Sequence, residues 1–198
     1  MVEKDAPSPE PDQIVLRSEA IGVNFGDILL RRGVYPMAPE FPFTPGFEVV
    51  GEVIAKGDGV EGLDIGDRCA AMTQGGAYAE QVCVDATNVF PAPEGIASEA
   101  LVAILIQGLT AWGLLDAARV VEGESVLVHS AAGGVGAMLV QLARQRGAST
   151  IFGAASRPVK LERIKTAGAD VAIDYSNEGW NEAVLESTSG RGVDIVFD

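Results

Sequence analysis

The chain has 198 residues, of which 47% are hydrophobic and 21% are charged, a composition that is typical of a folded globular chain and excludes an intrinsically disordered one. Its 28 acidic side chains exceed its 14 basic ones, for a net charge of −14, which disfavours nucleic acid as a partner. There is no unbroken run of about 18 apolar residues and no apolar segment near the N-terminus. We therefore expect no membrane span, no secretory signal and a cytoplasmic location.

The charge is uneven along the chain. Residues 1–100 carry a net charge of −11 and residues 101–198 a net charge of −3, so the second half is better suited to a polyanionic ligand. Cys69 and Cys83 are too few for a zinc knuckle, and we expect two reduced thiols, with a disulfide as the alternative. The sequence has one histidine, His129, which we expect to shape a turn rather than act as a base.

Short β-strands are predicted in the first half. Residues 14–21 and 48–56 are rich in β-branched residues, and frequent glycine and proline residues divide this half into short pieces, as in a small barrel or sandwich. Residues 26–33 could form one short helix. The pattern changes near residue 95, so we predict two domains, residues 1–94 and residues 95–198.

Strands and helices alternate in the second half. Residues 98–118 are apolar at helical spacing and open with Ser98 and Glu99, a predicted N-cap. After them we predict strands at 125–130, 149–154, 171–175 and 193–197, and helices at 134–146, 158–167 and 178–188. This alternation is typical of βαβ units in a parallel sheet. The predicted fold class is therefore α/β, with a β-rich domain first.

A glycine-rich turn lies between the first strand and the first helix of this alternation. Gly133 and Gly136 match the second and third glycines of G-x-G-x-x-G, with Ala131 at the first position. Glycine at 133 lets backbone N–H groups approach a pyrophosphate, and glycine at 136 lets the helix pack closely on the strand. The turn therefore predicts a dinucleotide site, the alternative being a tight turn that binds nothing.

The end of the second strand indicates which dinucleotide binds. An NAD site usually has an acidic residue there, but this chain has Ala155, followed by Ser156, Arg157 and Lys160. A hydroxyl and two cations suit a 2′-phosphate. We therefore predict NADPH, the alternative being that both cations belong to a solvated helix face.

Taken together, these segments resemble the medium-chain dehydrogenase/reductase superfamily, and within it the zinc-independent quinone oxidoreductase and enoyl reductase branch. The resemblance is carried by VNFGD at 23–27, RGVYP at 32–36, PGFEVVG at 45–51, GAYAE at 76–80, GLTA at 108–111, VHSAAGGVG at 128–136 and IDY at 173–175. It implies a GroES-like β-barrel domain followed by a Rossmann-type domain. Relative to the superfamily, the chain looks truncated at both ends, so we expect the 198 residues to be nearly inactive alone.

The resemblance also implies site residues. Those expected to contact the cofactor are Thr110, Ala132, Gly133, Gly134, Val135, Gly136, Ser156, Arg157, Lys160 and Tyr175. Asn24 and Tyr35 are the candidate catalytic donors, although Tyr35 could equally be a packing aromatic. The zinc alcohol dehydrogenases have a metal-ligating Cys and His where this chain has Asn24 and Phe47, neither of which suits zinc. We therefore expect no metal.

Without a Lewis acid, hydride transfer suits a substrate activated by conjugation. The expected substrate is a quinone, an enone or an enoyl thioester, reduced by NADPH. One alternative is the enoylreductase domain of a polyketide or fatty-acid synthase, and another is a non-catalytic nucleotide-binding member of the fold. Whether the protein forms a homodimer is left open.

Overall fold

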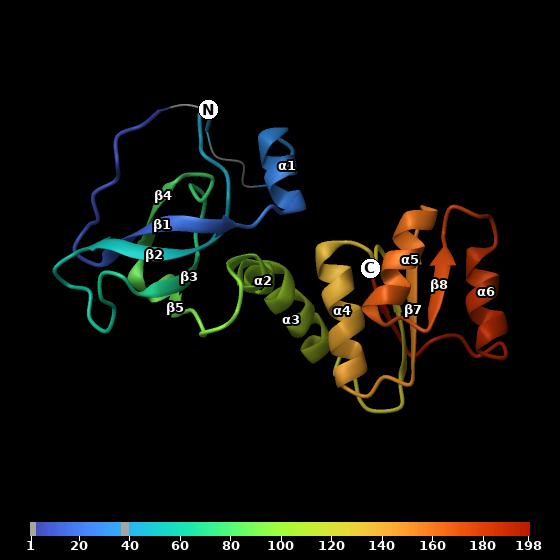
Figure 1. Cartoon of the computed structure of the whole chain (residues 1–198). Coiled ribbons are helices and arrows are strands. Elements are labelled where there is room, and N and C mark those ends of the chain that lie inside the picture. Colours follow the sequence, from blue (N-terminus) through green and yellow to red (C-terminus); the bar gives the residue numbers. More distant parts are fainter. Residues whose placement is uncertain (1–2, 37–39) are drawn as a thin grey trace. The chain divides into compact units, whose positions relative to one another are not determined.

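The first part of the chain forms an antiparallel sheet. The computed structural model describes residues 3–36 and 40–198 and divides into two units after Ile106 (Figure 1). In the first unit the strands follow the order β4-β1-β2-β3-β5. They are β1 (Gln13–Ile21), β2 (Glu48–Lys56), β3 (Arg68–Met72), β4 (Gln81–Asp85) and β5 (Val89–Pro91), with helix α1 (Phe25–Arg31) after β1 and a 3-10 turn, η1 (Ala86–Asn88), before β5.

Alternating apolar residues hold this sheet together. Ile14 and Leu16 of β1 point into the same buried cluster as Val49 and Val53 of β2, as expected when successive side chains of a strand face opposite sides. Val50, between them in sequence, belongs to a second buried cluster on the other face. The predicted strands at 14–21 and 48–56 and the short predicted helix are therefore confirmed.

The predicted helix at 98–118 is one helical run with a change of geometry in its middle. It consists of α2 (Ser98–Ala103), a π turn η2 (Ile104–Gly108) and α3 (Leu109–Ala117). Leu101, Val102 and Leu105 pack in the same buried cluster as Val50 and Ala70 of the sheet. The first compact unit extends to Ile106, within this run, and the predicted domain bounds of 1–94 and 95–198 stay a prediction.

The predicted N-cap of this helix is wrong. The N-cap residue is Ala97, which has no capping side chain. The Ser98 hydroxyl instead donates a 2.6 Å hydrogen bond to Glu19 Oε2 and accepts one of 2.7 Å from Arg68. Ser98 therefore ties the start of the helix to the sheet, because two charged partners from distant strands compete successfully for its hydroxyl.

By length and composition alone, the helical run Ser98–Ala117 could cross a membrane. Polar residues interrupt its apolar sequence. The core helix of a soluble protein can meet the same two criteria. Leu101 and Leu105 are buried against the first unit, and Ala111 and Leu115 are buried in the core of the second. The absence of a membrane span thus stays a prediction.

The second unit contains a parallel sheet in the order β8-β7-β6-β9. Its strands are β6 (Ser125–Val128), β7 (Thr150–Ala155), β8 (Val171–Asp174) and β9 (Ile195–Phe197), and its helices are α4 (Gly134–Gln145), α5 (Pro158–Ala167) and α6 (Trp180–Ser187). The predicted alternation is confirmed, and α5 begins at Pro158 as its sequence indicates. The α/β fold class is therefore correct.

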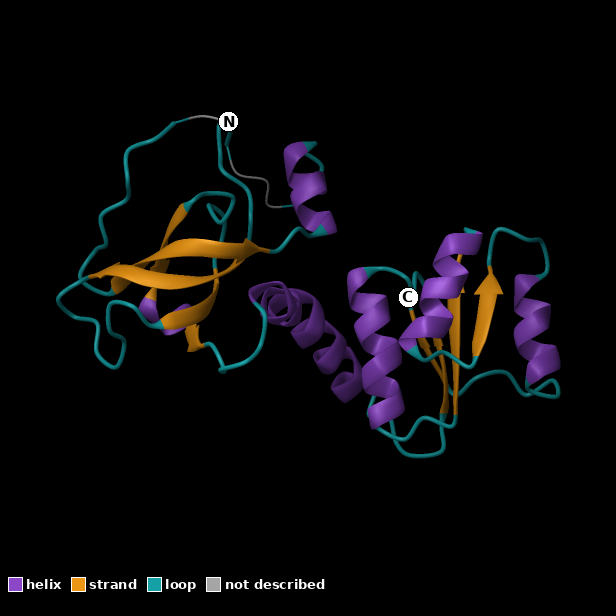
Figure 2. Ribbon diagram, in the orientation of Figure 1, coloured by secondary structure: helices purple, strands orange, loops and turns teal. Residues whose placement is uncertain are grey.

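Helices cover both faces of the parallel sheet (Figure 2). Val126 and Val128 of β6 face a buried cluster that α3, α4 and α5 complete. Leu127, between them, faces the opposite cluster with Phe152 and with Val184 of α6. Strands buried on both faces read as continuous apolar runs, which explains the composition of these segments.

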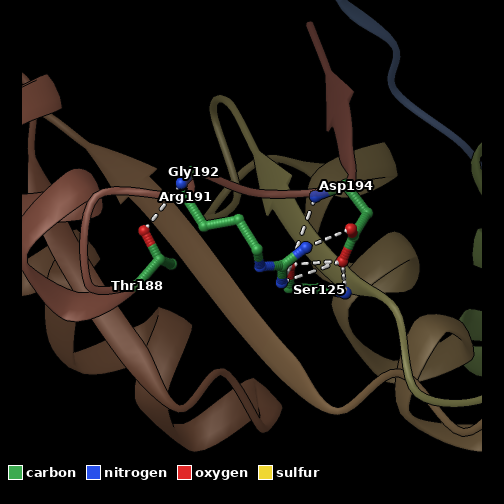
Figure 3. A network of polar contacts seen from close by, with 5 residues as sticks. All are labelled: Ser125, Thr188, Arg191, Gly192 and Asp194. Atoms are coloured by element: carbon green, nitrogen blue, oxygen red, sulfur yellow. Dashed lines mark hydrogen bonds and ion pairs between the residues drawn. The ribbon is translucent and has the colours of Figure 1, made fainter.

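A polar network fixes the start of β9 beside β6 (Figure 3). The buried Ser125 hydroxyl donates a 2.7 Å hydrogen bond to Asp194 Oδ2, and the Ser125 backbone N–H donates another of the same length to the same oxygen. Arg191 forms an ion pair with Asp194. Since β9 pairs over only three residues, these side-chain bonds add to the backbone pairs that align it with β6.

Candidate functional site

The glycine-rich turn begins with a backbone conformation that is rare for a residue with a side chain. The predicted strand at 125–130 ends at Val128, because Ser130 is left-handed with φ of 49° and cannot continue a strand. The Ser130 carbonyl accepts a 2.8 Å hydrogen bond from the Gly133 N–H. Gly133 is then the extended N-cap residue of α4. The first N–H groups of α4, which have no partner inside the helix, are available to an anion.

Three glycines of the turn are in close contact with other atoms. A Cβ atom on Gly136 would stand 2.5 Å from the Ser130 carbonyl oxygen, and one on Gly133 would stand 3.1 Å from the same atom. A Cβ on Gly134 would stand 2.1 Å from Oε1 of Gln107. The turn therefore has no room for side chains where the helix meets the strand, as a pyrophosphate-binding turn requires.

Gln107 is a residue that sequence reasoning missed. It lies in the π turn η2, and its side-chain amide packs against Gly134. π turns are frequent at functional sites because they rotate side chains out of the regular helical phase. The apolar periodicity of residues 98–118 gave no signal for this turn, since a π turn changes hydrogen bonding without changing composition.

The predicted phosphate-binding residues lie where β7 passes into α5. Ala155 is buried at the end of β7, Arg157 is the N-cap residue of α5, and both Arg157 and Lys160 are exposed. Within residues 3–36 and 40–198, neither cation forms an ion pair with a carboxylate. Ser156 lies next to them and is partly buried. The arrangement offers two unpaired cations to an anion.

Aromatic residues gather at the same edge of the sheet. The Tyr175 N–H donates a 3.1 Å hydrogen bond to the Ala155 carbonyl, which brings the end of β8 beside the end of β7. The His129 ring stacks with Tyr175 at a centroid distance of 6.3 Å and meets Trp180 edge-on at 5.2 Å. The backbone N–H of His129 also donates a hydrogen bond to the Phe197 carbonyl. His129 therefore holds the turn after β6, and Trp180 is a second residue that sequence reasoning did not single out.

The remaining predicted cofactor residues are distributed over the second unit. Thr110 is exposed on α3. Ala132 lies in the turn, and Val135 lies in the first turn of α4. The turn and the ends of β7 and β8 thus meet at the carboxyl edge of the parallel sheet, where ligands of such sheets bind.

In the first unit, Asn24 is the N-cap residue of α1. Its backbone N–H donates a 2.9 Å hydrogen bond to Asp27 Oδ2, and the other oxygen of that buried carboxylate accepts 3.0 Å from the Gly46 N–H. The Asn24 side chain donates through Nδ2 to Glu48 Oε1 at 2.8 Å. Asn24 is therefore held at its backbone and at its side chain by two different carboxylates.

Glu48 is completely buried. This burial raises the pKa of its carboxyl, while hydrogen bonds from Asn24 and from the Ile106 N–H oppose the rise. Tyr78 lies nearby, and burial, aided by the Asp27 carboxylate, raises the pKa of its phenol to about 12. Among the described residues, the buried Tyr78 hydroxyl has no hydrogen-bond partner.

Tyr35 is 39% exposed and follows α1. Its ring lies close to Gly26, since a Cβ atom there would stand 3.7 Å from Tyr35 Cε2. Phe47 is partly buried beside Glu48 in sequence. No set of three or more His, Cys, Asp or Glu side chains within the described residues could hold a metal ion. Cys69 and Cys83 are both free thiols.

Both units match families of known proteins. Residues 10–94 match the family described as alcohol dehydrogenase GroES-like domain, and residues 134–198 match the family described as zinc-binding dehydrogenase. The chain belongs to the medium-chain dehydrogenase/reductase superfamily. The GroES-like domain corresponds to the antiparallel sheet and the second match to the parallel sheet.

Several members of the superfamily are similar to this chain over nearly its whole length. The human synaptic vesicle membrane protein VAT-1 homolog is 41% identical over 97% of this chain and 49% of its own length. The 2-haloacrylate reductase of Burkholderia sp. is 37% identical over 96% of this chain and 59% of its own length. The structure of Escherichia coli quinone oxidoreductase complexed with NADPH superposes with a TM-score of 0.93 at 34% identity, over all of this chain and 60% of that one. This chain thus spans about half to three fifths of the length of these superfamily members.

Proposed function

We propose that the protein is an NADPH-dependent oxidoreductase that transfers hydride to a quinone or to an α,β-unsaturated carbonyl compound without zinc. The observation that carries the proposal is the carboxyl edge of the parallel sheet. There the buried Ala155 stands where an NAD site usually has an acid, and Arg157 and Lys160, which form no ion pair within residues 3–36 and 40–198, lie at the start of α5. The NADPH complex of a quinone oxidoreductase with the same fold supports this choice of cofactor.

The residues of the turn fit the cofactor. Gly136 leaves space only for hydrogen, so α4 can direct its N-terminal N–H groups at a pyrophosphate. Arg157, Lys160 and the Ser156 hydroxyl would hold a 2′-phosphate. Thr110 and Tyr175 are the further cofactor contacts in this proposal. When bound, NADPH would supply the hydride.

A conjugated substrate is favoured because the chain offers hydrogen-bond donors rather than a metal. The resemblance to the superfamily implies that Asn24 and Phe47 stand where zinc alcohol dehydrogenases have metal ligands. The Asn24 amide nitrogen is turned toward Glu48, and neither residue suits zinc. The substrate oxygen that gains negative charge needs donors. The Asn24 amide and the exposed Tyr35 hydroxyl are the candidates, with the proton coming from solvent. The 2-haloacrylate reductase acts, by its name, on a conjugated acid.

The experiment uses the protein as its gene encodes it and compares four hydride acceptors. NADPH oxidation is followed with an enone, a quinone, an enoyl thioester and a saturated ketone. We expect turnover of one or more of the conjugated acceptors and none of the ketone. Turnover of the ketone alone would show that the proposal is wrong. Zinc analysis of the same sample should find much less than one metal ion per chain.

Two other functions are tested by the same assay. A preference for the enoyl thioester over the free enone would favour an enoylreductase domain of a synthase. NADPH binding without turnover of any acceptor would favour a non-catalytic nucleotide-binding protein. The similarity to a relative named as a synaptic vesicle membrane protein makes this second outcome worth a direct test, together with the cytoplasmic location that we propose.

A further inference from the structure

Glu48 is a buried carboxylate that the proposed hydride transfer does not use. It lies at the start of β2 with no exposed surface, and the residues that follow it, Val49 and Val50, belong to the apolar clusters on the two faces of the sheet. An ionised carboxylate costs several kcal/mol to bury and persists only where donors satisfy it. Its partners therefore indicate what it is for.

The two carboxylate oxygens of Glu48 accept from two segments that are far apart in the sequence. Asn24 Nδ2 donates to Oε1 at 2.8 Å, and the Ile106 backbone N–H donates to Oε2 at 2.8 Å. Asn24 begins α1, and Ile106 lies inside the π turn η2. One buried side chain thus joins a candidate catalytic residue to the turn that leads into α3.

The Glu48 carboxylate is packed closely against the backbone of Gly22. A Cβ atom on Gly22 would stand 1.9 Å from Glu48 Oε1 and 2.3 Å from its Cδ. The Gly22 N–H also donates to the Glu48 carbonyl at 3.3 Å, so strand pairing holds the two residues together. The carboxylate is therefore confined by backbone on one side and by its two donors on the others.

This confinement determines the orientation of the Asn24 amide. An asparagine side chain has a donor end and an acceptor end, and only the donor end can face a carboxylate. Asp27 holds the backbone of the same residue through the Asn24 N–H. Glu48 thereby sets the direction in which the amide oxygen and the second amide hydrogen of Asn24 point.

Glu48 also accepts a hydrogen bond from the π turn η2. In a regular α-helix the Ile106 N–H would donate to the carbonyl four residues earlier, but here it donates to Glu48 at the turn where the helix widens. Gln107, which packs on Gly134 of the nucleotide turn, and Thr110, in α3, follow directly in the sequence.

We propose that Glu48 is a positioning residue, which orients the Asn24 amide for reaction and ties it to the π turn that precedes α3. The inference rests on the proposed oxidoreductase function for one point, the reaction for which the Asn24 amide is oriented. It also predicts a hydrogen-bond arrangement that can be observed without turnover, so the two proposals can fail separately.

The kinetic test is a double-mutant cycle in the protein as its gene encodes it. Glu48→Gln keeps the size of the side chain but places an amide hydrogen opposite one of the two donors. We expect kcat to fall about tenfold or more, with the KM values changing less than about threefold. In the Asn24→Ala background the same substitution should cost less than about twofold, because residues that act through one another are not additive. Equal losses of kcat in both backgrounds would overturn the proposal.

Two further variants separate positioning from stability. Glu52→Gln is the control, because Glu52 lies on the same strand but pairs with Arg17 at the surface; its kcat should be unchanged. Gly22→Ala should displace the Glu48 side chain without altering any charge, and should lower kcat as Glu48→Gln does. Normal kcat in a folded Gly22→Ala variant would count against the proposal.

The direct readout is nuclear magnetic resonance of the side-chain amide of Asn24 and the backbone amide of Ile106. Glu48→Gln should shift both signals and speed their hydrogen exchange. If the wild-type protein reduces no acceptor, the proposed function fails, and these signals still test the arrangement. Unchanged Asn24 side-chain signals in a folded Glu48→Gln protein would overturn the positioning role, whatever the kinetics show.

Discussion

The Ser130 carbonyl oxygen lies 2.5 Å from the point where a Cβ atom on Gly136 would stand. Ser130 is itself left-handed, a conformation that costs roughly 1–3 kcal/mol for a residue with a side chain. The strained residue and the glycine together bring the first turn of α4 against the end of β6. The proposed pyrophosphate site depends on this approach.

Gly136→Ala should therefore disrupt the turn. We expect the free energy of unfolding to fall by roughly 1–3 kcal/mol, as in overpacked cores, and NADPH affinity to fall at least about tenfold, because the N–H groups of α4 must move. Gly113→Ala is the matched control. Gly113 lies in the exposed part of α3 with no atom near its missing side chain, so alanine there should stabilise the helix by about 0.5–1 kcal/mol. Thermal unfolding and nucleotide fluorescence measure both effects, and equal behaviour of the two variants would contradict the assignment.

Arg157→Ala should weaken NADPH binding and leave NADH binding nearly unchanged. A charge-assisted hydrogen bond contributes about 1.5–3 kcal/mol, so the Kd for NADPH should rise by roughly one to two orders of magnitude. Arg163→Ala is the control, because Arg163 is exposed on the same helix. Fluorescence titration with both nucleotides distinguishes the outcomes, and a parallel loss of NADH affinity would mean that Arg157 does not bind the 2′-phosphate.

Tyr78→Phe should be neutral or stabilising near pH 7, because it removes a buried hydroxyl that has no hydrogen-bond partner within residues 3–36 and 40–198. Burial raises the pKa of the Tyr78 phenol from 10.0 to about 12. The folded state therefore favours the neutral phenol, and this contribution is fully present below pH 10 and is lost as the pH rises through 12. Wild-type stability should fall more steeply than that of Tyr78→Phe over this interval in urea unfolding. A loss of more than about 1 kcal/mol near pH 7 would instead indicate a functional hydrogen bond to Asp27.

Asp194→Asn should destabilise the second unit at neutral pH and reduce its sensitivity to acid. Hydrogen bonds from Arg191 and Ser125 hold the pKa of the Asp194 carboxyl below its usual range. The contribution is therefore present above the ordinary pKa of aspartate and is lost as the pH falls through the lowered value. The stability difference between wild type and variant should shrink toward low pH. The exposed Asp58, changed to Asn, is the control, and identical pH profiles for wild type and Asp194→Asn would refute the role of this network.

Local patterns in the sequence were sufficient for β1, β2, α1 and the elements after residue 125, whereas the short strands β3, β4 and β5 were not predicted individually. Alternation in β1 and β2 and the βαβ order after residue 125 depend on which face of an element is buried, and this periodicity is written in neighbouring residues. Pro158 marked the start of α5 for the same reason, since its fixed φ acts within one residue. The glycine turn was also recognisable, because its spacing reflects a backbone path of only six residues.

Partners that are distant in the sequence were decided by the tertiary structure alone. Ser98 reads as an N-cap, but Glu19 and Arg68 from two strands take its hydroxyl. In the sequence Glu48 is part of the PGFEVVG segment, but its burial and its bonds to Asn24 and Ile106 arise from packing. The π turn and the contact between Gln107 and Gly134 likewise leave no local signal. The sequence by itself determined periodicity and backbone freedom, which are local; the tertiary structure decided which buried polar groups meet, because that depends on how the elements pack.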